Sequence, residues 1–176
     1  KFIHCLKETV KLGIIYPIKI IELSEDEEEV NLSRFKVTAV KASHKDILAY
    51  SYIIKEEDRP GKFHPEKATL LGIPEGELWG KLQAGQKIIL NDAIYTPQQV
   101  LGPPRKGLKI VYSGDTRPNT NLQKLSAYAD ILIHESTFND EHSDKAHDYG
   151  HSTATEAAQV ALNAAVKKLI LFHISP

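Results

Sequence analysis

The fold is decided by the stretch Lys109-Ile110-Val111-Tyr112-Ser113-Gly114-Asp115-Thr116-Arg117-Pro118. Its first half is rich in residues that favour β-strands, and Gly114 with the turn residues after it ends the strand at Asp115. A carboxylate is therefore left at the C-terminal edge of a strand, where open α/β sheets usually hold their ligands. The stretch predicts an α/β protein whose functional site includes Asp115.

Two other apolar runs end in the same way, each with an imidazole. Residues 35–44 end at His44, and residues 168–173 end at His173. Imidazole and carboxylate groups suit zinc, and suit iron or manganese less selectively, and a carboxylate can bridge two ions. A single histidine at a strand end is more often structural. The coincidence of His44, Asp115 and His173 nevertheless predicts one shared metal site.

Composition is that of an ordinary globular chain with room for one core and an appendage. The chain has 176 residues, 41% hydrophobic and 26% charged, with a net charge of −1 when histidine is neutral. No global positive field indicates a nucleic acid, so such a contact would need a local patch. The single cysteine, Cys5, excludes an internal disulfide and fits a reducing compartment. The sequence has no apolar run near 18 residues and no leader pattern, which predicts neither a membrane span nor a signal peptide.

Residues 1–56 are expected to belong to the core. Residues 1–13 have the apolar spacing of a helix, and residues 14–23 are typical of a strand in which Pro17 favours a sheet edge. The acidic run of residues 24–29 predicts a solvated loop. Residues 35–43 and 48–55 alternate apolar and polar side chains, which predicts two strands around the loop that carries His44.

Residues 57–107 are predicted to form an insertion in that core. Glycine and proline interrupt the segment, and only residues 65–71 are expected to form a short helix, entered through proline. Its seven Lys and Arg residues nearly balance six acids, so a ligand would be held by shape and backbone. Trp79 could stack on such a ligand, although a local packing anchor is favoured. Long insertions are tolerated thermodynamically and tend to be functional.

Residues 108–176 return to the core and alternate strands with helices. We expect a helix over 119–129, a strand over 131–133, helix within 140–149 and a strand over 168–173. Thr153-x-x-Glu156 matches a capping box ahead of a helix that runs to about Val166. The resulting β-α-β-α-α-β order is that of a layered α/β fold.

His151 stands directly before this last helix, where free backbone N–H groups attract anions. Ser152 and Thr153 could complete a phosphate-binding cradle, with His151 giving a proton to a leaving oxygen. An equally weighted alternative is that Ser152 or Thr153 only caps the helix. His134 and Glu135, at the end of strand 131–133, could form an outer shell in which the carboxylate orients a metal-binding imidazole.

Four motifs resemble, in order and spacing, the downstream motifs of ribonuclease Z. They are Ser113-Gly114-Asp115-Thr116-Arg117, Ile133-His134-Glu135-Ser136-Thr137-Phe138, Gly150-His151-Ser152-Thr153 and Phe172-His173-Ile174-Ser175. Residues 57–62, 71–74 and 79–82 resemble the protruding arm of the same family. The resemblance covers nearly the whole chain. It implies a metallo-β-lactamase-type αββα sandwich, here mainly its C-terminal half, with core segments 1–56 and 108–176 and a flexible arm at 57–107.

The resemblance implies a zinc-dependent endoribonuclease that removes the 3′ trailer from precursor tRNA by phosphodiester hydrolysis. It makes His44 a ligand of the first of two zinc ions, His173 a ligand of the second, Asp115 the bridge and His151 the proton donor. The family also uses an upstream His-x-His-x-Asp-His motif, which this sequence lacks. Either the motif belongs to an upstream segment, or the protein cannot hold its metals. Because the chain begins at Lys1 and contains no methionine, we expect it to be a piece of a longer protein, and without the motif we expect this piece to be inactive on its own.

The resemblance also implies the partners and the compartment. We expect precursor tRNA, a second copy of the chain in a homodimer, no membrane, and a cytoplasmic or organellar location. The expected tRNA contacts on the arm are Arg59, Gly61, Lys62, Gly72, Pro74, Gly76 and Lys81.

Two other functions stay open. One is hydrolysis of a small phosphodiester or sulfate ester on the same fold and metals, although a small substrate needs no distant arm. The other is a catalytically incomplete fragment that only binds tRNA or forms a dimer.

Overall fold

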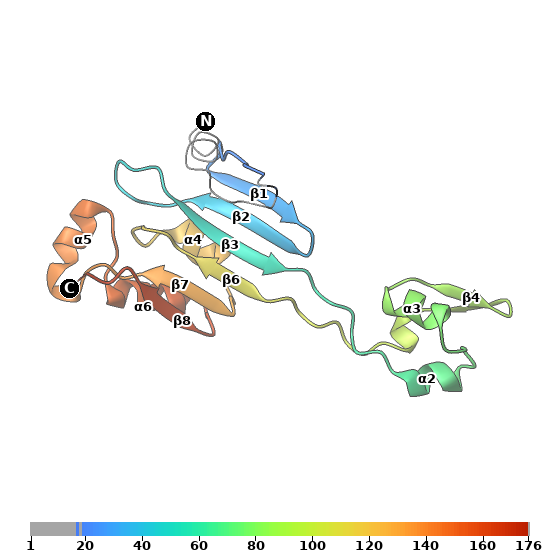
Figure 1. Ribbon diagram of the computed structural model, residues 1–176. Helices are drawn as coiled ribbons and strands as arrows, with labels where there is room; N and C mark the ends of the chain where they lie inside the picture. The colour runs from blue at the N-terminus through green and yellow to red at the C-terminus, as the bar shows by residue number, and fades with distance from the viewer. Residues whose placement is uncertain (1–16, 18, 176) are drawn as a thin grey trace.

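The computed structural model describes Pro17 and residues 19–175 (Figure 1). Its main element is a six-stranded sheet in the order β1-β2-β3-β6-β7-β8. The strands are β1 (Glu27–Leu32), β2 (Phe35–Lys41), β3 (Tyr50–Glu56), β6 (Lys109–Tyr112), β7 (Ile131–Glu135) and β8 (Leu169–Phe172). Strands β1 to β3 and β6 pair antiparallel, whereas β6, β7 and β8 are parallel. The three parallel strands therefore end at one common edge of the sheet.

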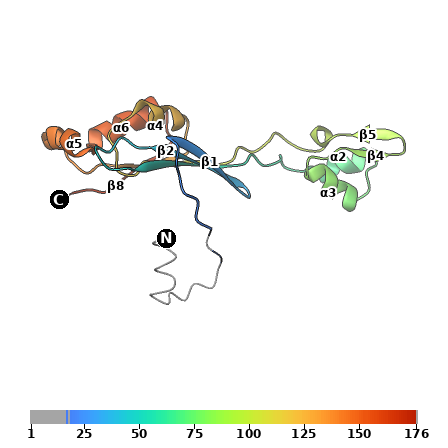
Figure 2. The same cartoon turned by 90° about the horizontal axis from the view of Figure 1, so that it is seen from above.

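The described helices of the core all cover one face of this sheet (Figure 2). They are α4 (Thr120–Leu125), α5 (Ser143–Tyr149) and α6 (Ala154–Asn163), with a 3₁₀ turn, η2 (Asp140–His142), before α5. Buried Val40, Val111 and Leu132 of the sheet pack against Leu122 of α4 and Val160 of α6. This arrangement, one sheet with one helical layer, is half of the αββα sandwich that the sequence predicts.

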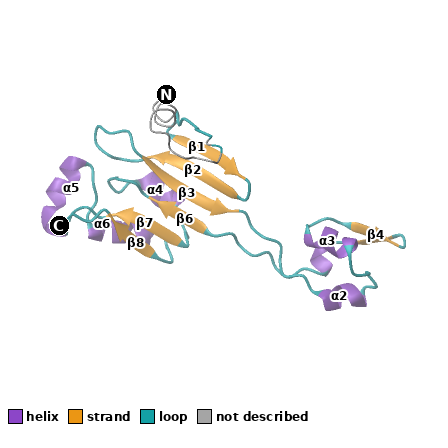
Figure 3. Cartoon of the chain, viewed as in Figure 1, coloured by secondary structure: helices purple, strands orange, loops and turns teal. Residues whose placement is uncertain are grey.

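The insertion has a small hydrophobic core of its own and lies apart from the sheet at the end of two extended segments (Figure 1). It contains α2 (Pro65–Leu70), α3 (Glu77–Gln83), the 3₁₀ turn η1 (Pro97–Gln99) and a hairpin of β4 (Ile88–Leu90) and β5 (Ala93–Tyr95) (Figure 3). Its core consists of Ala68, Ile73, Leu82, Ile88 and Val100. Trp79 packs against this cluster and donates a hydrogen bond from Nε1 to the carbonyl oxygen of Ile73 at 2.9 Å, which agrees with a packing anchor.

Several sequence expectations about local structure are wrong. Within the insertion, the sequence predicts regular secondary structure only for residues 65–71. Helix α3 and the β4–β5 hairpin also form there. Packing on the local core stabilises these elements, which are too short to show a clear period in the sequence. Residues 19–23 form no strand. The acidic run is only partly a loop, since its last three residues begin β1. Pairing with β2 overrides the low strand propensity of glutamate, and Glu29 meets Lys36 in an ion pair at 2.8 Å.

Other expectations differ only in their bounds. Helix α4 spans Thr120–Leu125 after Asn119, whose side chain accepts a hydrogen bond from the N–H of Leu122. Helix α6 ends at Asn163 and not near Val166, because Ala165 has a positive φ of 50°. The expected helix over residues 1–13 lies outside the described residues. Within the part of the chain that the structure describes, no helix is long and apolar enough to cross a membrane.

Candidate metal centre

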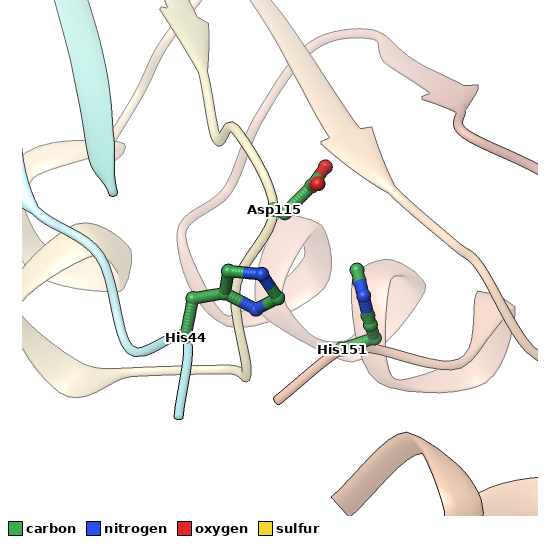
Figure 4. Close-up of side chains that lie close together, drawn as sticks. All are labelled: His44, Asp115 and His151. Atoms are coloured by element: carbon green, nitrogen blue, oxygen red, sulfur yellow. The ribbon is translucent and has the colours of Figure 1, made fainter. Parts of the chain in front are cut away.

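Side chains from separate segments gather at the edge where the parallel strands end. His44 follows β2, Asp115 follows β6, His151 lies between α5 and α6, and His173 follows β8. Donor atoms of His44, Asp115 and His151 all lie within 4.8 Å of one another, and Figure 4 shows these side chains around a common space. Donor atoms of Glu135, His151 and His173 form a second such group. The two groups share His151.

Direct distances tie the two groups together. Nδ1 of His173 lies 3.6 Å from Oδ1 of Asp115. The ring centroid of His151 lies 4.7 Å from that of His44 and 5.4 Å from that of His173. The structure therefore places His173 beside Asp115, and His151 beside both His44 and His173.

Two unusual backbone conformations help to position these side chains. Gly114 has a φ of +60°, and a Cβ at this position would lie 2.7 Å from the carbonyl oxygen of Tyr50. Only glycine can therefore turn the chain so sharply between β6 and Asp115. His173 has a φ of 55°, which is uncommon for a residue other than glycine and is typical of functional sites.

Glu135 is a fully buried carboxylate beside His151. It accepts hydrogen bonds from the N–H of Thr116 at 3.0 Å, the N–H of Thr137 at 3.0 Å and Oγ1 of Thr137 at 2.9 Å. Burial acts to raise the pKa of Glu135, but hydrogen bonds from the N–H groups of Thr137, Thr116 and Ser152 outweigh it and hold the pKa below its ordinary value. Glu135 is therefore an ionised acceptor, and Nδ1 of His151, 2.8 Å from Oε1, must carry a hydrogen.

The other two imidazoles are also held through Nδ1. Nδ1 of His44 lies 3.0 Å from the carbonyl oxygen of Gly150, which can only accept a hydrogen bond. Nδ1 of His173 lies 2.8 Å from Oγ1 of Thr137, whose own hydrogen is used in the bond to Glu135. In all three histidines Nδ1 is therefore the donor. In His44 and His173, Nε2 then keeps the lone pair with which an imidazole binds a metal.

Comparison with known proteins finds relatives of the chain. No protein-family model matches it. Ribonuclease Z of Nitrosopumilus maritimus is 45% identical to it over 175 residues, which are 99% of this chain and 58% of that protein. The chain is a ribonuclease Z homologue. It spans about half the length of the curated ribonuclease Z relatives that it matches, between 52% and 58% for the first three.

Solved structures support the fold. Human tRNase Z, short form, superimposes with a TM-score of 0.54 at 23% identity, covering 86% of this chain and 41% of that one. The metallo-β-lactamase-fold protein YhfI of Bacillus subtilis gives a TM-score of 0.52 at 17% identity, covering 87% and 42%. The predicted fold class, a partial α/β fold of metallo-β-lactamase type, is confirmed.

Three residues that the sequence places at the site of the ribonuclease Z homologue, His134, Ser152 and Thr153, make their hydrogen bonds within the protein. His134 is buried on the same face of β7 as Leu132, and burial lowers its pKa. Its Nδ1 lies 2.8 Å from the carbonyl oxygen of Glu135, and no described residue pairs with its Nε2. The hydroxyl of Ser152 is buried and donates to the carbonyl oxygen of Thr116 at 2.6 Å. Thr153 caps α6 by accepting a hydrogen bond from the N–H of Glu156 at 3.2 Å. Both hydroxyls are thus used inside the protein, as in the capping alternative.

Sequence reasoning missed two groups that support the site. Thr137 links Glu135 to His173, as described above. Nη1 of Arg117 donates to the carbonyl oxygen of His151 and to Oε2 of Glu156, both at 2.7 Å, and so joins the turn that carries His151 to the start of α6. The available signal for Arg117 was its position two residues after Asp115 in the stretch that decides the fold.

The side chains at the site of the homologue are of the types that bind zinc, but they are too few to hold two zinc ions. Zinc binds imidazole nitrogen and carboxylate oxygen, and a catalytic ion takes about three protein ligands. Divided between two ions as the resemblance implies, His44, Asp115 and His173 would give each ion fewer than three ligands. Two ions would need further donors from outside these residues.

Proposed function

We propose that this chain is the C-terminal part of a zinc-dependent endoribonuclease that removes the 3′ trailer from precursor tRNA. The observation that carries this function is the convergence of His44, Asp115, His151 and His173 at one edge of the sheet. It is supported by the name ribonuclease Z, which the matched relatives bear. The activity belongs to the longer protein, and this piece alone is inactive because it has too few metal ligands.

His44, Asp115 and His173 would hold the zinc ions, with Asp115 as the bridge. When bound, zinc polarises phosphoryl oxygens and activates water for attack on phosphorus. The remaining ligands would come from an upstream segment with the His-x-His-x-Asp-His motif.

His151 supplies the proton that the leaving oxygen needs. Hydrolysis breaks one P–O bond, so the 3′ oxygen of the tRNA must be protonated while the trailer keeps the 5′-phosphate. Glu135 orients the ring of His151 through the contact with Nδ1, and Nε2 would donate the proton to the leaving oxygen. Arg117 fixes the backbone of His151 through its carbonyl oxygen.

Residues 57–107 would bind the tRNA away from the reaction. Gly72, Pro74 and Gly76 lie in the exposed turn between α2 and α3 and can approach RNA through their backbone. Arg59 and Lys81 form ion pairs with Glu56 and Glu77, while Lys62 is exposed and Gly61 is buried. In a homodimer, the arm of one copy would hold the tRNA for cleavage at the active site of either copy.

Zinc content and trailer cleavage test this function. Both are measured on residues 1–176 and on a longer chain that includes the upstream motif, with precursor tRNA and bis-p-nitrophenyl phosphate as substrates. The longer chain should hold two zinc ions and release the trailer. Cleavage of the small ester without tRNA processing would instead favour a small-ester enzyme, and cleavage of neither substrate would leave a binding fragment.

A further inference from the structure

A surface cavity of about 410 Å³ lies where the two extended segments enter the insertion. It is far along the chain from the metal ligands and is formed by the incoming segment, the outgoing segment and the end of α3. Its lining residues are Pro60, Gly61, Lys62, Phe63, Gln83 and Arg105.

Backbone pairing holds the two segments in place on either side of the cavity. Arg59 and Arg105 exchange N–H···O bonds of 2.9 Å, and the N–H of Gly102 donates to the carbonyl oxygen of Lys62 at 2.8 Å. A Cβ on Gly61 would lie 1.9 Å from the carbonyl oxygen of Gly102, so the segments can approach this closely only because residue 61 is glycine. The cavity is therefore a feature of packed backbone and not of a loose loop.

The charge of the cavity is positive and is not neutralised locally. Lys62 and Arg105 come from opposite segments, and no acid is among the lining residues. Neither cation is in an ion pair with any described acid. Nε of Arg105 donates to the carbonyl oxygen of Pro60 at 3.1 Å, which orients the guanidinium and leaves its two terminal nitrogens for a ligand.

From this geometry we infer that the cavity binds a backbone phosphate of RNA. The inference deepens the proposed function and rests on it, because the RNA would be the precursor tRNA held by the insertion. Arg105 supplies two donors in the planar arrangement that matches phosphate oxygens, Lys62 supplies a second charge, and the Gln83 amide a further donor. Such contacts position a nucleic acid without reading its sequence. Arg105 is thus a positioning residue that was not among the expected tRNA contacts.

The test measures binding of precursor tRNA to the full-length, zinc-loaded protein at several salt concentrations. Arg105→Gln should weaken binding about tenfold near physiological salt and lower the slope of log affinity against log salt by about one. Arg105→Lys should keep the slope but lose part of the affinity, because the charge stays and the planar pair of donors is lost. Lys106→Gln is the matched control, since this exposed neighbour lies outside the cavity lining and should have a smaller effect on both quantities.

The outcomes separate this inference from the proposed function. If the wild-type protein releases the trailer but Arg105→Gln binds precursor tRNA with unchanged affinity and salt slope, the phosphate site is wrong and the nuclease stands. Equal effects of Arg105→Gln and Lys106→Gln would also overturn it, because only general charge would then matter. Inorganic phosphate at constant ionic strength should compete only weakly. If it instead occupies the Arg105-dependent site in preference to RNA, the site binds the free ion and the inference fails.

Discussion

Glu135 organises the candidate site at the scale of a single residue. Its Oε2 accepts two hydrogen bonds from Thr137, and its Oε1 accepts one from Thr116 and also lies 2.8 Å from Nδ1 of His151. In Glu135→Gln, one carboxylate oxygen becomes an NH₂ group. This group faces hydrogen-bond donors of Thr116, Thr137 or His151 and cannot accept from them. In the full-length protein we expect kcat for trailer release to fall about 10- to 100-fold, because His151 loses the partner that holds it.

This effect is measured by single-turnover cleavage at saturating zinc, with zinc content determined on the same samples. Zinc content should not change, because Glu135 is not one of the proposed ligands. Glu141→Gln is the matched control, since Glu141 is an exposed acid that lies close to Glu135 along the chain. A wild-type kcat in Glu135→Gln would rule out the role given to this carboxylate.

Asp130 joins the starts of three strands and predicts a pH dependence. Its carboxylate accepts hydrogen bonds from Nζ of Lys167 at 2.6 Å and from the N–H of Lys109 at 2.8 Å, and these contacts hold its pKa below the ordinary value. A lowered pKa in the folded state stabilises the protein above the unfolded-state pKa of about 3.9, and this stability is lost as the pH falls through the folded-state pKa. Asp130→Asn should therefore lower the free energy of unfolding by about 1 kcal/mol at pH 7. Urea unfolding of both proteins should show this difference shrinking below about pH 4, and a difference independent of pH would contradict the assignment.

At the scale of an element, the insertion depends on the close approach of its two entering segments. Gly61→Ala places a methyl group where the carbonyl oxygen of Gly102 already lies, so the segments must separate and the cavity at Arg105 must change shape. We expect faster proteolysis within residues 57–107 and weaker binding of precursor tRNA. Gly80→Ala is the matched control, because nothing lies within 4 Å of its Cβ position in α3 and alanine should stabilise that helix by about 0.5–1 kcal/mol. Equal protease resistance of the two variants would show that the close approach is not needed.

At the scale of the whole molecule, the sheet and the insertion have separate cores and should be separable in function. Residues 60–104 can be replaced by a short Gly-Ser linker, because Arg59 and Arg105 pair with each other across the two extended segments that lead into the insertion. In the full-length protein, kcat/KM for precursor tRNA should fall about 100-fold, equivalent to the loss of roughly two charge-assisted hydrogen bonds. Hydrolysis of bis-p-nitrophenyl phosphate should be retained. An equal loss on both substrates would mean that the insertion supports the core and does not act as a handle for tRNA.

Local sequence signals predicted most of the core and the strand ends that carry His44, Asp115 and His173, but not Thr137 or Arg117. The strands that end before His44, Asp115 and His173, the helix after Asn119 and the capping box at Thr153 depend on interactions over a few residues. Such interactions can be recognised in the sequence, since strand propensity, turn residues and caps act locally. The order of the motifs along the chain is also read from the sequence, and the similarity to ribonuclease Z of Nitrosopumilus maritimus agrees with it.

Only the tertiary structure decided how these residues work together. The hydrogen bond between His44 and Gly150 joins residues 106 apart in the chain, and that between His173 and Thr137 joins residues 36 apart, so neither has a local signal. The same holds for the core of the insertion and for the cavity that unites Lys62 with Arg105. Sequence alone determined which side chains stand at the ends of strands. Packing of the sheet and closure of the insertion determined which of them meet, because those contacts form only when distant segments fold together.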